Sequence, residues 1–235
     1  MATEAERMRF HRHVVKLLYL AKRTRPDCLT AGEAFLTTRV TKCSVDDLVK
    51  LERLLKYVCA TRDRGIVFEA GSKGIVVSVL IDAAYGVHPD GKSHTESCVV
   101  VGLRGAVHCK SAKQQIVTKS STEAELVALS DSTNRALYLR NFIIGQGHTP
   151  GPVMVYQDNM SCMSLIERGR STGERTSHIS IKYFWLKERA DMGEARVVHL
   201  GTKEMYANLL TKPLQGAQFK SERYGITGWE EDILA

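Results

Sequence analysis

The sequence lacks the features of several specialised classes of protein. Its five prolines and 18 glycines follow no short repeat, which excludes a collagen-like or low-complexity chain. The six cysteines include no CxxC pair, so their spacing excludes a zinc ribbon. No run approaches the roughly 20 apolar residues of a membrane helix, and the charged start MATEAERMRFHRH contains no apolar secretory core. We therefore expect an intracellular protein with reduced thiols and no membrane partner.

The remaining composition is that of a folded protein with a basic balance. The chain has 235 residues, of which 43% are hydrophobic, enough for one domain or two small ones. The net charge is +7, and residues 1–70 hold 14 basic and 9 acidic residues, so most of the excess lies there. Two interpretations stay open, a solvated helix face or a surface that follows phosphates. The basic residues concerned are Arg12, Lys16, Lys22, Arg23 and Arg25.

The first 60 residues show helical periodicity. Apolar residues recur at helical spacing from Phe10 to Ala21, and Pro26 ends that helix because proline disfavours a helical residue before it. A second helix is expected over residues 29–39. Ser44 begins a capping-box pattern, which predicts a third helix from residue 45 to about residue 58.

After residue 65 the pattern changes to strands that alternate with helices. Apolar runs at 76–81, 98–103, 106–109, 153–157 and 196–200 predict strands. Helices are expected from residue 121 to the glycines near 145, then up to about 168, over 177–190 and over 203–212. Strands mixed with crossover helices predict a mixed sheet in an α/β domain.

Acidic residues stand where such a sheet would bring them together. Asp82 and Asp158 each follow an apolar strand, and the carboxyl ends of parallel neighbours meet at one edge of a sheet. Glu123 and Glu125 lie in the first turn of the long helix, and one of them would face that edge. Converging carboxylates repel one another unless a hard cation such as Mg²⁺ binds them. The alternative is that each acid is an ordinary turn or helix-start residue.

Several longer blocks carry a resemblance to a known family. SSTEAELVAL around Glu125 and VYQDN around Asp158 resemble the glutamate and central aspartate motifs of retroelement ribonuclease H domains. With IDAAYGVHPDGKSHT, RTSHISIKYFWL and ANLLTKPLQG, they resemble the end of a copia-type retrotransposon Pol polyprotein. KLLYLAKRTRPD and LKYVCATRDRGIVF resemble the end of the reverse transcriptase that precedes this domain. The resemblance therefore covers nearly the whole chain.

The resemblance implies a fold, an activity and a division of the chain. It implies a ribonuclease H-like α/β fold, a mixed five-stranded sheet with flanking helices, at 71–215. A helical reverse transcriptase segment at 1–70 would precede it, and a tail at 216–235 would follow. The implied activity is hydrolysis of the RNA strand of RNA–DNA hybrids with two Mg²⁺ or Mn²⁺ ions, which activate a water and stabilise the leaving 3′ oxygen. Asp82, Glu125 and Asp158 resemble the metal-binding catalytic acids.

The implied partners are an RNA–DNA hybrid and the rest of the Pol polyprotein. The implied locations are the cytoplasm, a virus-like particle or the nucleus. The polymerase aspartates lie outside this chain, so no DNA synthesis is expected from it.

Two positions depart from the family pattern. Asn208 stands where the family usually has a fourth metal-binding aspartate, and its amide offers a carbonyl ligand without charge. Glu96 stands where the family often has glycine, in the first hairpin. The alternatives to a nuclease are therefore an inactive nucleic-acid-binding remnant or a purely structural fragment.

Other residues have weaker functional interpretations. His199 ends the last strand and is either a proton carrier or an ordinary strand-end residue. His178 either contacts substrate or caps its helix. Candidate phosphate contacts, for which isolated surface cations are the alternative, are Lys110, Lys113, Lys119 and Arg135.

Overall fold

A computed structural model describes residues 2–30, 35–72, 74–168, 180–201, 204–210 and 214–229. His178 lies outside these residues. Within the described ranges, no helix combines the length and the apolar character needed to cross a bilayer.

The N-terminal part forms a small helical layer. Helix α1 begins with a capping box in which Thr3 and Glu6 bond reciprocally, and its inner face is buried. Helix α2 begins with the expected box at Ser44, which Asp47 completes. Of the expected helix over 29–39, residues 31–34 lie outside the described part of the chain, and its end, Leu36–Arg39, is a 3₁₀ helix. The elements of this layer are α1 (Glu4–Arg23), η1 (Pro26–Cys28), η3 (Leu36–Arg39) and α2 (Val45–Ala60).

One basic residue of this layer is not on its surface. Arg25 is 3% exposed, and its guanidinium donates two hydrogen bonds to the Asp27 carboxylate, at 3.0 and 2.8 Å. Tyr57 from α2 donates to the same carboxylate at 2.6 Å. Arg25 therefore links the turn that follows α1 to α2, and the expectation that it belongs to the exposed basic surface is wrong.

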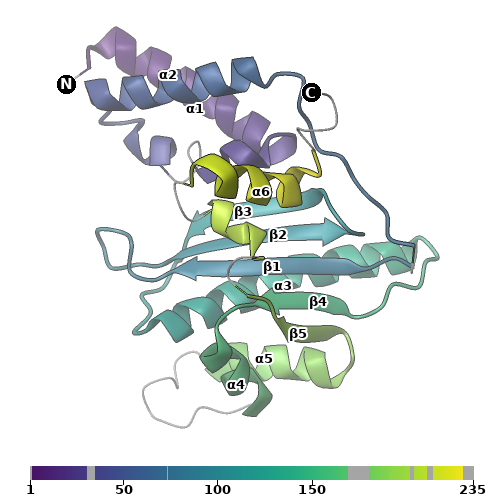
Figure 1. Cartoon of the computed structure of the whole chain (residues 1–235). Helices are drawn as coiled ribbons and strands as arrows, with labels where there is room; N and C mark the ends of the chain where they lie inside the picture. The colour runs from purple at the N-terminus through teal and green to yellow at the C-terminus, as the bar shows by residue number, and fades with distance from the viewer. Residues whose placement is uncertain are drawn as a thin grey trace.

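The rest of the chain forms a five-stranded mixed sheet with flanking helices, as expected. The strand order is β3-β2-β1-β4-β5, with antiparallel pairs β1–β2 and β2–β3 and parallel pairs β1–β4 and β4–β5. Figure 1 shows α3 behind the sheet, α4 and α5 beside β5, and the N-terminal helices beyond β3. The elements are β1 (Val77–Ala84), β2 (His94–Val101), β3 (Ala106–Lys113), α3 (Ser121–Gly145), β4 (Val153–Gln157), α4 (Met160–Arg168), α5 (Ser180–Asp191), β5 (Ala195–His199), η5 (Tyr206–Leu210) and α6 (Gly216–Thr227).

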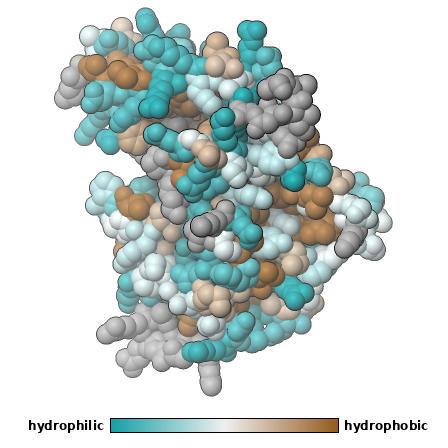
Figure 2. Space-filling model, viewed as in Figure 1, coloured by the Kyte–Doolittle hydropathy of each residue, from teal (hydrophilic) through white to brown (hydrophobic). Residues whose placement is uncertain are grey.

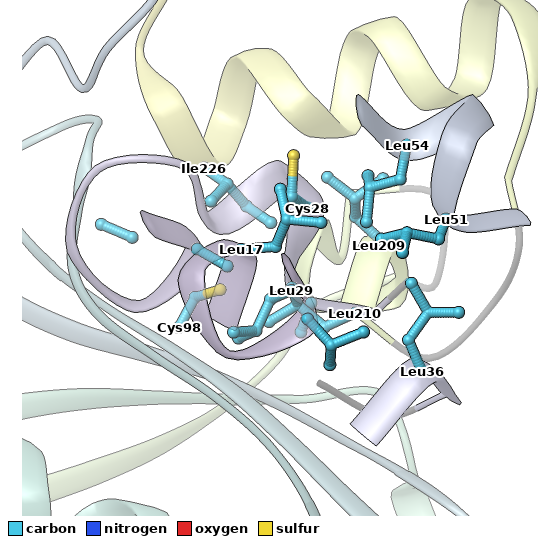
Figure 3. Packing of buried hydrophobic residues seen from close by; sticks show 14 of the residues in the cluster. Leu17, Cys28, Leu29, Leu36, Leu51, Leu54, Cys98, Leu209, Leu210 and Ile226 are labelled. Carbon is cyan, nitrogen blue, oxygen red and sulfur yellow. The ribbon is translucent and has the colours of Figure 1, made fainter. Parts of the chain in front are cut away.

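The two faces of the sheet carry separate hydrophobic cores. On one face Val79 and Ile81 pack against Leu126 and Leu129 of α3. On the other face Leu80 and Cys98 pack against the N-terminal helices, η5 and α6. Figure 3 shows this second core, in which leucines of the helical layer lie among Leu209, Leu210 and Ile226. The helical layer and the sheet thus share one core, while the division of the chain into domains stays a prediction.

The C-terminal part differs from the expected pattern. The described part of the expected helix at 203–212 is the 3₁₀ helix η5. The segment expected as a tail contains α6, which packs closely on η5. Gly225 permits this contact, because a Cβ there would overlap the ring of Tyr206. Figure 2 shows that apolar residues on this side of the molecule lie in small, separate areas of a mainly hydrophilic surface.

Candidate metal and nucleic-acid site

The sheet brings Asp82 and Asp158 to neighbouring positions. β1 and β4 are parallel partners, with Leu80 opposite Tyr156, and Asp158 follows directly after β4. The sequence predicted that Asp82 follows the strand. β1 continues to Ala84, so Asp82 instead lies within it. Alternation along β1 places Asp82 on the same face as Leu80. The prediction that the two strands are parallel neighbours is confirmed.

Helix α3 supplies the third carboxylate. Ser120 caps the helix by accepting a hydrogen bond from the Glu123 N–H. The Glu123 carboxylate accepts from the Lys119 N–H at 2.7 Å, so it belongs to the helix start. Glu125 is 5% exposed and faces the sheet. Of the two candidate glutamates, Glu125 is therefore the one that meets the aspartates.

Asp82, Glu125 and Asp158 converge on one point. Each offers one carboxylate oxygen, and these three oxygens lie within 4.8 Å of one another. Two groups hold the Glu125 carboxylate: the Ala83 N–H donates to Oε1 at 3.3 Å, and Gln157 Nε2 donates to Oε2 at 3.1 Å. Both donors are chain neighbours of the other two acids.

The convergence has an electrostatic cost. Burial, followed by the nearby charges of Asp82 and Asp158, raises the pKa of Glu125 to about 8, although the hydrogen bonds from Gln157 and Ala83 act in the opposite direction. Glu125 is therefore mainly protonated at pH 7 when no cation is bound. A bound cation would displace that proton, because a metal ligand must be deprotonated.

The donor set fits a hard divalent cation. Three carboxylates and no sulfur or imidazole ligand form the cluster among the described residues, and Mg²⁺ and Mn²⁺ prefer oxygen ligands. A raised carboxyl pKa at a point where acids meet is also typical of functional sites. The roles of these residues in metal binding and catalysis stay predictions.

Asn208 lies in η5, on the sheet face that carries Asp82. It is 2% exposed, and its neighbours Ala207 and Leu209 pack in the same core as Leu80 of β1. η5 contacts both β1 and β2. The fold therefore places Asn208 on the correct side of the sheet for a fourth ligand, and its metal-binding role stays a prediction.

The sequence did not predict the polar neighbours of the acids. Glu96 pairs with Asp82 across the β1–β2 ladder and is 1% exposed, and the hairpin forms in regular register despite this departure from glycine. Its Oε1 lies 3.5 Å from His94 Nε2. Burial lowers the pKa of His94 to about 4, with contributions from His88 and Lys110, so the imidazole is neutral at pH 7 and this contact is no ion pair. Glu96 lies in the polar segment His94–Ser97, which precedes the apolar run at 98–103 from which the strand was predicted.

The candidate phosphate contacts lie on β3, before α3 and on α3. Lys113 forms an ion pair with Asp90 at 2.6 Å, which offsets its charge, and Lys119 is exposed before α3. Lys110 and the exposed Arg135 both act on His108: burial first, then Arg135, Lys110 and Lys22, lower the pKa of that imidazole.

His199 lies at the same sheet edge as the acids. It is exposed and pairs with Gln157, the residue before Asp158. The role of His199, like the roles of the candidate phosphate contacts, stays a prediction.

The described residues form an α/β domain with three acids at one edge of a mixed sheet. The sequence of the chain is similar to those of Pol polyproteins. The chain is 28% identical over 217 residues to the retrovirus-related Pol polyprotein from transposon RE1 of Arabidopsis thaliana. It is 25% identical over 207 residues to that from transposon TNT 1-94 of Nicotiana tabacum. These matches cover 91% and 88% of this chain but 14% and 15% of the relatives. The expected resemblance to retrotransposon Pol polyproteins is confirmed. No protein-family model matches the chain.

Comparison of structures finds ribonuclease H proteins at low overall similarity. LC11-RNase H1 in complex with RNA/DNA hybrid matches 57% of this chain and 92% of its own, with 17% identity and a TM-score of 0.42. The ribonuclease H domain of prototype foamy virus matches 58% of this chain and 88% of its own, with 16% identity and a TM-score of 0.38.

Proposed function

We propose that this chain is a divalent-metal-dependent endonuclease that hydrolyses the RNA strand of RNA–DNA hybrids, as part of a retrotransposon Pol polyprotein. The observation that carries the proposal is the convergence of Asp82, Glu125 and Asp158 within 4.8 Å at the carboxyl edge of parallel strands. The Pol polyprotein relatives support the context, and the basic balance of the chain suits a polyanionic substrate.

The chain's own residues would bind the metal, orient the Glu125 carboxylate and release a proton from it. Asp82, Glu125 and Asp158 would hold Mg²⁺ or Mn²⁺, and Asn208 would add a carbonyl oxygen. The bound metal supplies an activated water and charge stabilisation at the leaving 3′ oxygen. Glu125 gives up its proton when the site fills, while the donors from Ala83 and Gln157 keep its carboxylate directed at the site. Lys119, Arg135 and Lys110 would contact backbone phosphates.

One observation favours a second candidate function. Asn208 carries no charge where the resemblance implies a fourth acid, and one negative charge fewer weakens the attraction for cations. The second candidate is therefore a nucleic-acid-binding remnant that binds hybrids without turnover.

Cleavage of a hybrid with a labelled RNA strand, in Mg²⁺ and Mn²⁺ side by side, tests the proposal. We expect the wild-type chain to cleave and Asp158→Asn to lose about 100-fold or more, because even outer-shell partners of a metal contribute 10- to 100-fold. Asp131→Asn is the matched control, since Asp131 is an exposed acid of α3 that pairs with Lys182.

Each other result has a defined meaning. Equal cleavage by wild type and Asp158→Asn would contradict the assignment of the site. Salt-sensitive binding without cleavage would support the remnant, because phosphate contacts weaken as salt rises. Absence of hybrid binding at low salt would contradict both functions and support a purely structural fragment.

A further inference from the structure

Gln157 occupies a central position between two of the three acids. It is the last residue of β4, its side chain is fully buried, and it directly precedes Asp158. Its Oε1 accepts hydrogen bonds from the backbone N–H groups of Asp158, at 2.8 Å, and Asn159, at 2.9 Å. Its Nε2 donates to Glu125 Oε2 at 3.1 Å. One amide therefore connects the turn that carries Asp158 with the carboxylate of Glu125.

The hydrogen-bond partners fix the orientation of this amide. The two backbone N–H groups are donors and need the oxygen, so the nitrogen must face the carboxylate. A flipped amide would direct an N–H at two N–H groups and an oxygen at a carboxylate. Gln157 is thus an obligatory donor to Glu125, and its burial together with these three hydrogen bonds holds it in place.

We propose that Gln157 is a positioning residue that sets the separation and orientation of Glu125 and Asp158 for a divalent cation. This inference rests on the proposed function of the acidic site. The Oε1 bonds hold the start of the turn after β4, and the Nε2 bond fixes the carboxylate that comes from α3. Without this link, Glu125 on α3 and Asp158 after β4 can shift relative to each other. Ordering them on binding then reduces the affinity for the cation.

Two substitutions of Gln157 distinguish its bonds to the turn after β4 from its bond to Glu125. Gln157→Asn keeps an amide that can still accept from the backbone of the turn, but it is one methylene too short to bond both the turn and Glu125. Gln157→Met keeps the length and loses both tasks. Gln114→Asn is the matched control, because Gln114 is a buried glutamine whose Nε2 bonds Ala124 O at 2.9 Å and Thr95 Oγ1 at 3.0 Å beside the same helix.

Calorimetric titration of the full chain with Mn²⁺, well below the unfolding temperature of each variant, is the main measurement. We expect Gln157→Asn and Gln157→Met to bind Mn²⁺ about 10-fold or more weakly than wild type, and Gln114→Asn to bind it as wild type does. In the cleavage assay, kcat should fall with KM for the hybrid unchanged, and excess Mn²⁺ should restore part of the loss. Hybrid affinity in EDTA should be unchanged in all variants, which shows that each is folded.

The outcomes separate this inference from the proposed function. Wild-type Mn²⁺ affinity in either folded Gln157 variant overturns the positioning role and leaves the nuclease proposal intact. An equal loss in Gln114→Asn also overturns it, since that loss would reflect general packing. Failure of the wild-type chain to bind Mn²⁺ overturns the metal site itself and this inference with it.

Discussion

The backbone N–H of Ala83 donates a hydrogen bond of 3.3 Å to Glu125 Oε1. Ala83 directly follows Asp82 in β1, so this bond joins the strand of one candidate metal ligand to the side chain of another. The bond lowers the pKa of Glu125, but burial and the two aspartates outweigh it and raise that pKa to about 8. The resting site is therefore under electrostatic tension that a cation would relieve.

Glu125 makes the stability of the cation-free protein depend on pH. Its pKa in the folded state, about 8, lies above its ordinary value of 4.5, so the folded chain holds a proton that the unfolded chain releases. The contribution of Glu125 to the free energy of unfolding therefore falls as pH rises from about 4.5 to 8. Glu125→Gln removes this fall, so the variant should gain stability over wild type, on the order of a few kcal/mol, at pH 9 but not at pH 4.5.

Urea denaturation in EDTA at the two pH values measures this difference. Glu123→Gln is the control, because Glu123 bonds the helix start. A difference between Glu125→Gln and wild type that is the same at both pH values would contradict the assignment of the raised pKa.

Asn208→Asp should strengthen cation binding. The new carboxylate adds a negative charge on the sheet face that carries Asp82, so we expect Mn²⁺ affinity to rise and the cation-free protein to lose stability. Calorimetry with Mn²⁺ measures the first effect and thermal unfolding in EDTA the second. Asn134→Asp is the control, since Asn134 is exposed on α3. Unchanged Mn²⁺ affinity in Asn208→Asp would place residue 208 outside the site.

Leu29→Ala should destabilise both parts of the chain together. Leu29 is fully buried in the core that the helical layer shares with the sheet, so its truncation should lower the free energy of unfolding by about 2–5 kcal/mol. Trp185 packs on the opposite core, and its fluorescence in a Trp229→Phe background reports the sheet side. Its unfolding midpoint should move with the circular-dichroism midpoint. Separate midpoints would show that the two parts unfold independently, and Val15→Ala, at an exposed position of α1, is the control.

Cys59 should be the thiol that reacts fastest in the folded protein. It is exposed in α2, whereas Cys28, Cys43, Cys98 and Cys162 are buried and Cys109 is half-buried. Burial also raises the pKa of Cys28 to about 12, which suppresses its reactive thiolate. Titration with a chromogenic disulfide should show one fast thiol that Cys59→Ser removes. Two fast thiols in the native state would contradict the burial of the others.

Much of the candidate site could be predicted from local patterns. Asp158 directly follows the short apolar run that predicted the strand at 153–157. Ser120 marks the start of the helix that carries Glu125. These features depend on residues that are neighbours along the chain, so they can be predicted from the sequence. The choice of Glu125 over Glu123 came from the resemblance, and the structure agrees because Glu123 bonds back to Lys119.

The remaining features depend on contacts between distant segments. Gln157 meets Glu125 32 positions away, and a glutamine at a strand end has no local signature of this role. Glu96 is opposite Asp82 because of the ladder register, which an apolar pattern starting at residue 98 did not show. Helix α6 is stabilised by packing on η5, and its own polar sequence resembled a tail.

The core shared by the helical layer and the sheet has a consequence for a severed chain. The connection between α2 and β1 adds a Val67 N–H bond to Thr227 O and a Glu69–Arg104 bridge, while the apolar contacts lie elsewhere. A protease that cut after Arg64 would therefore produce two fragments that stay associated and migrate as one particle until a denaturant is added.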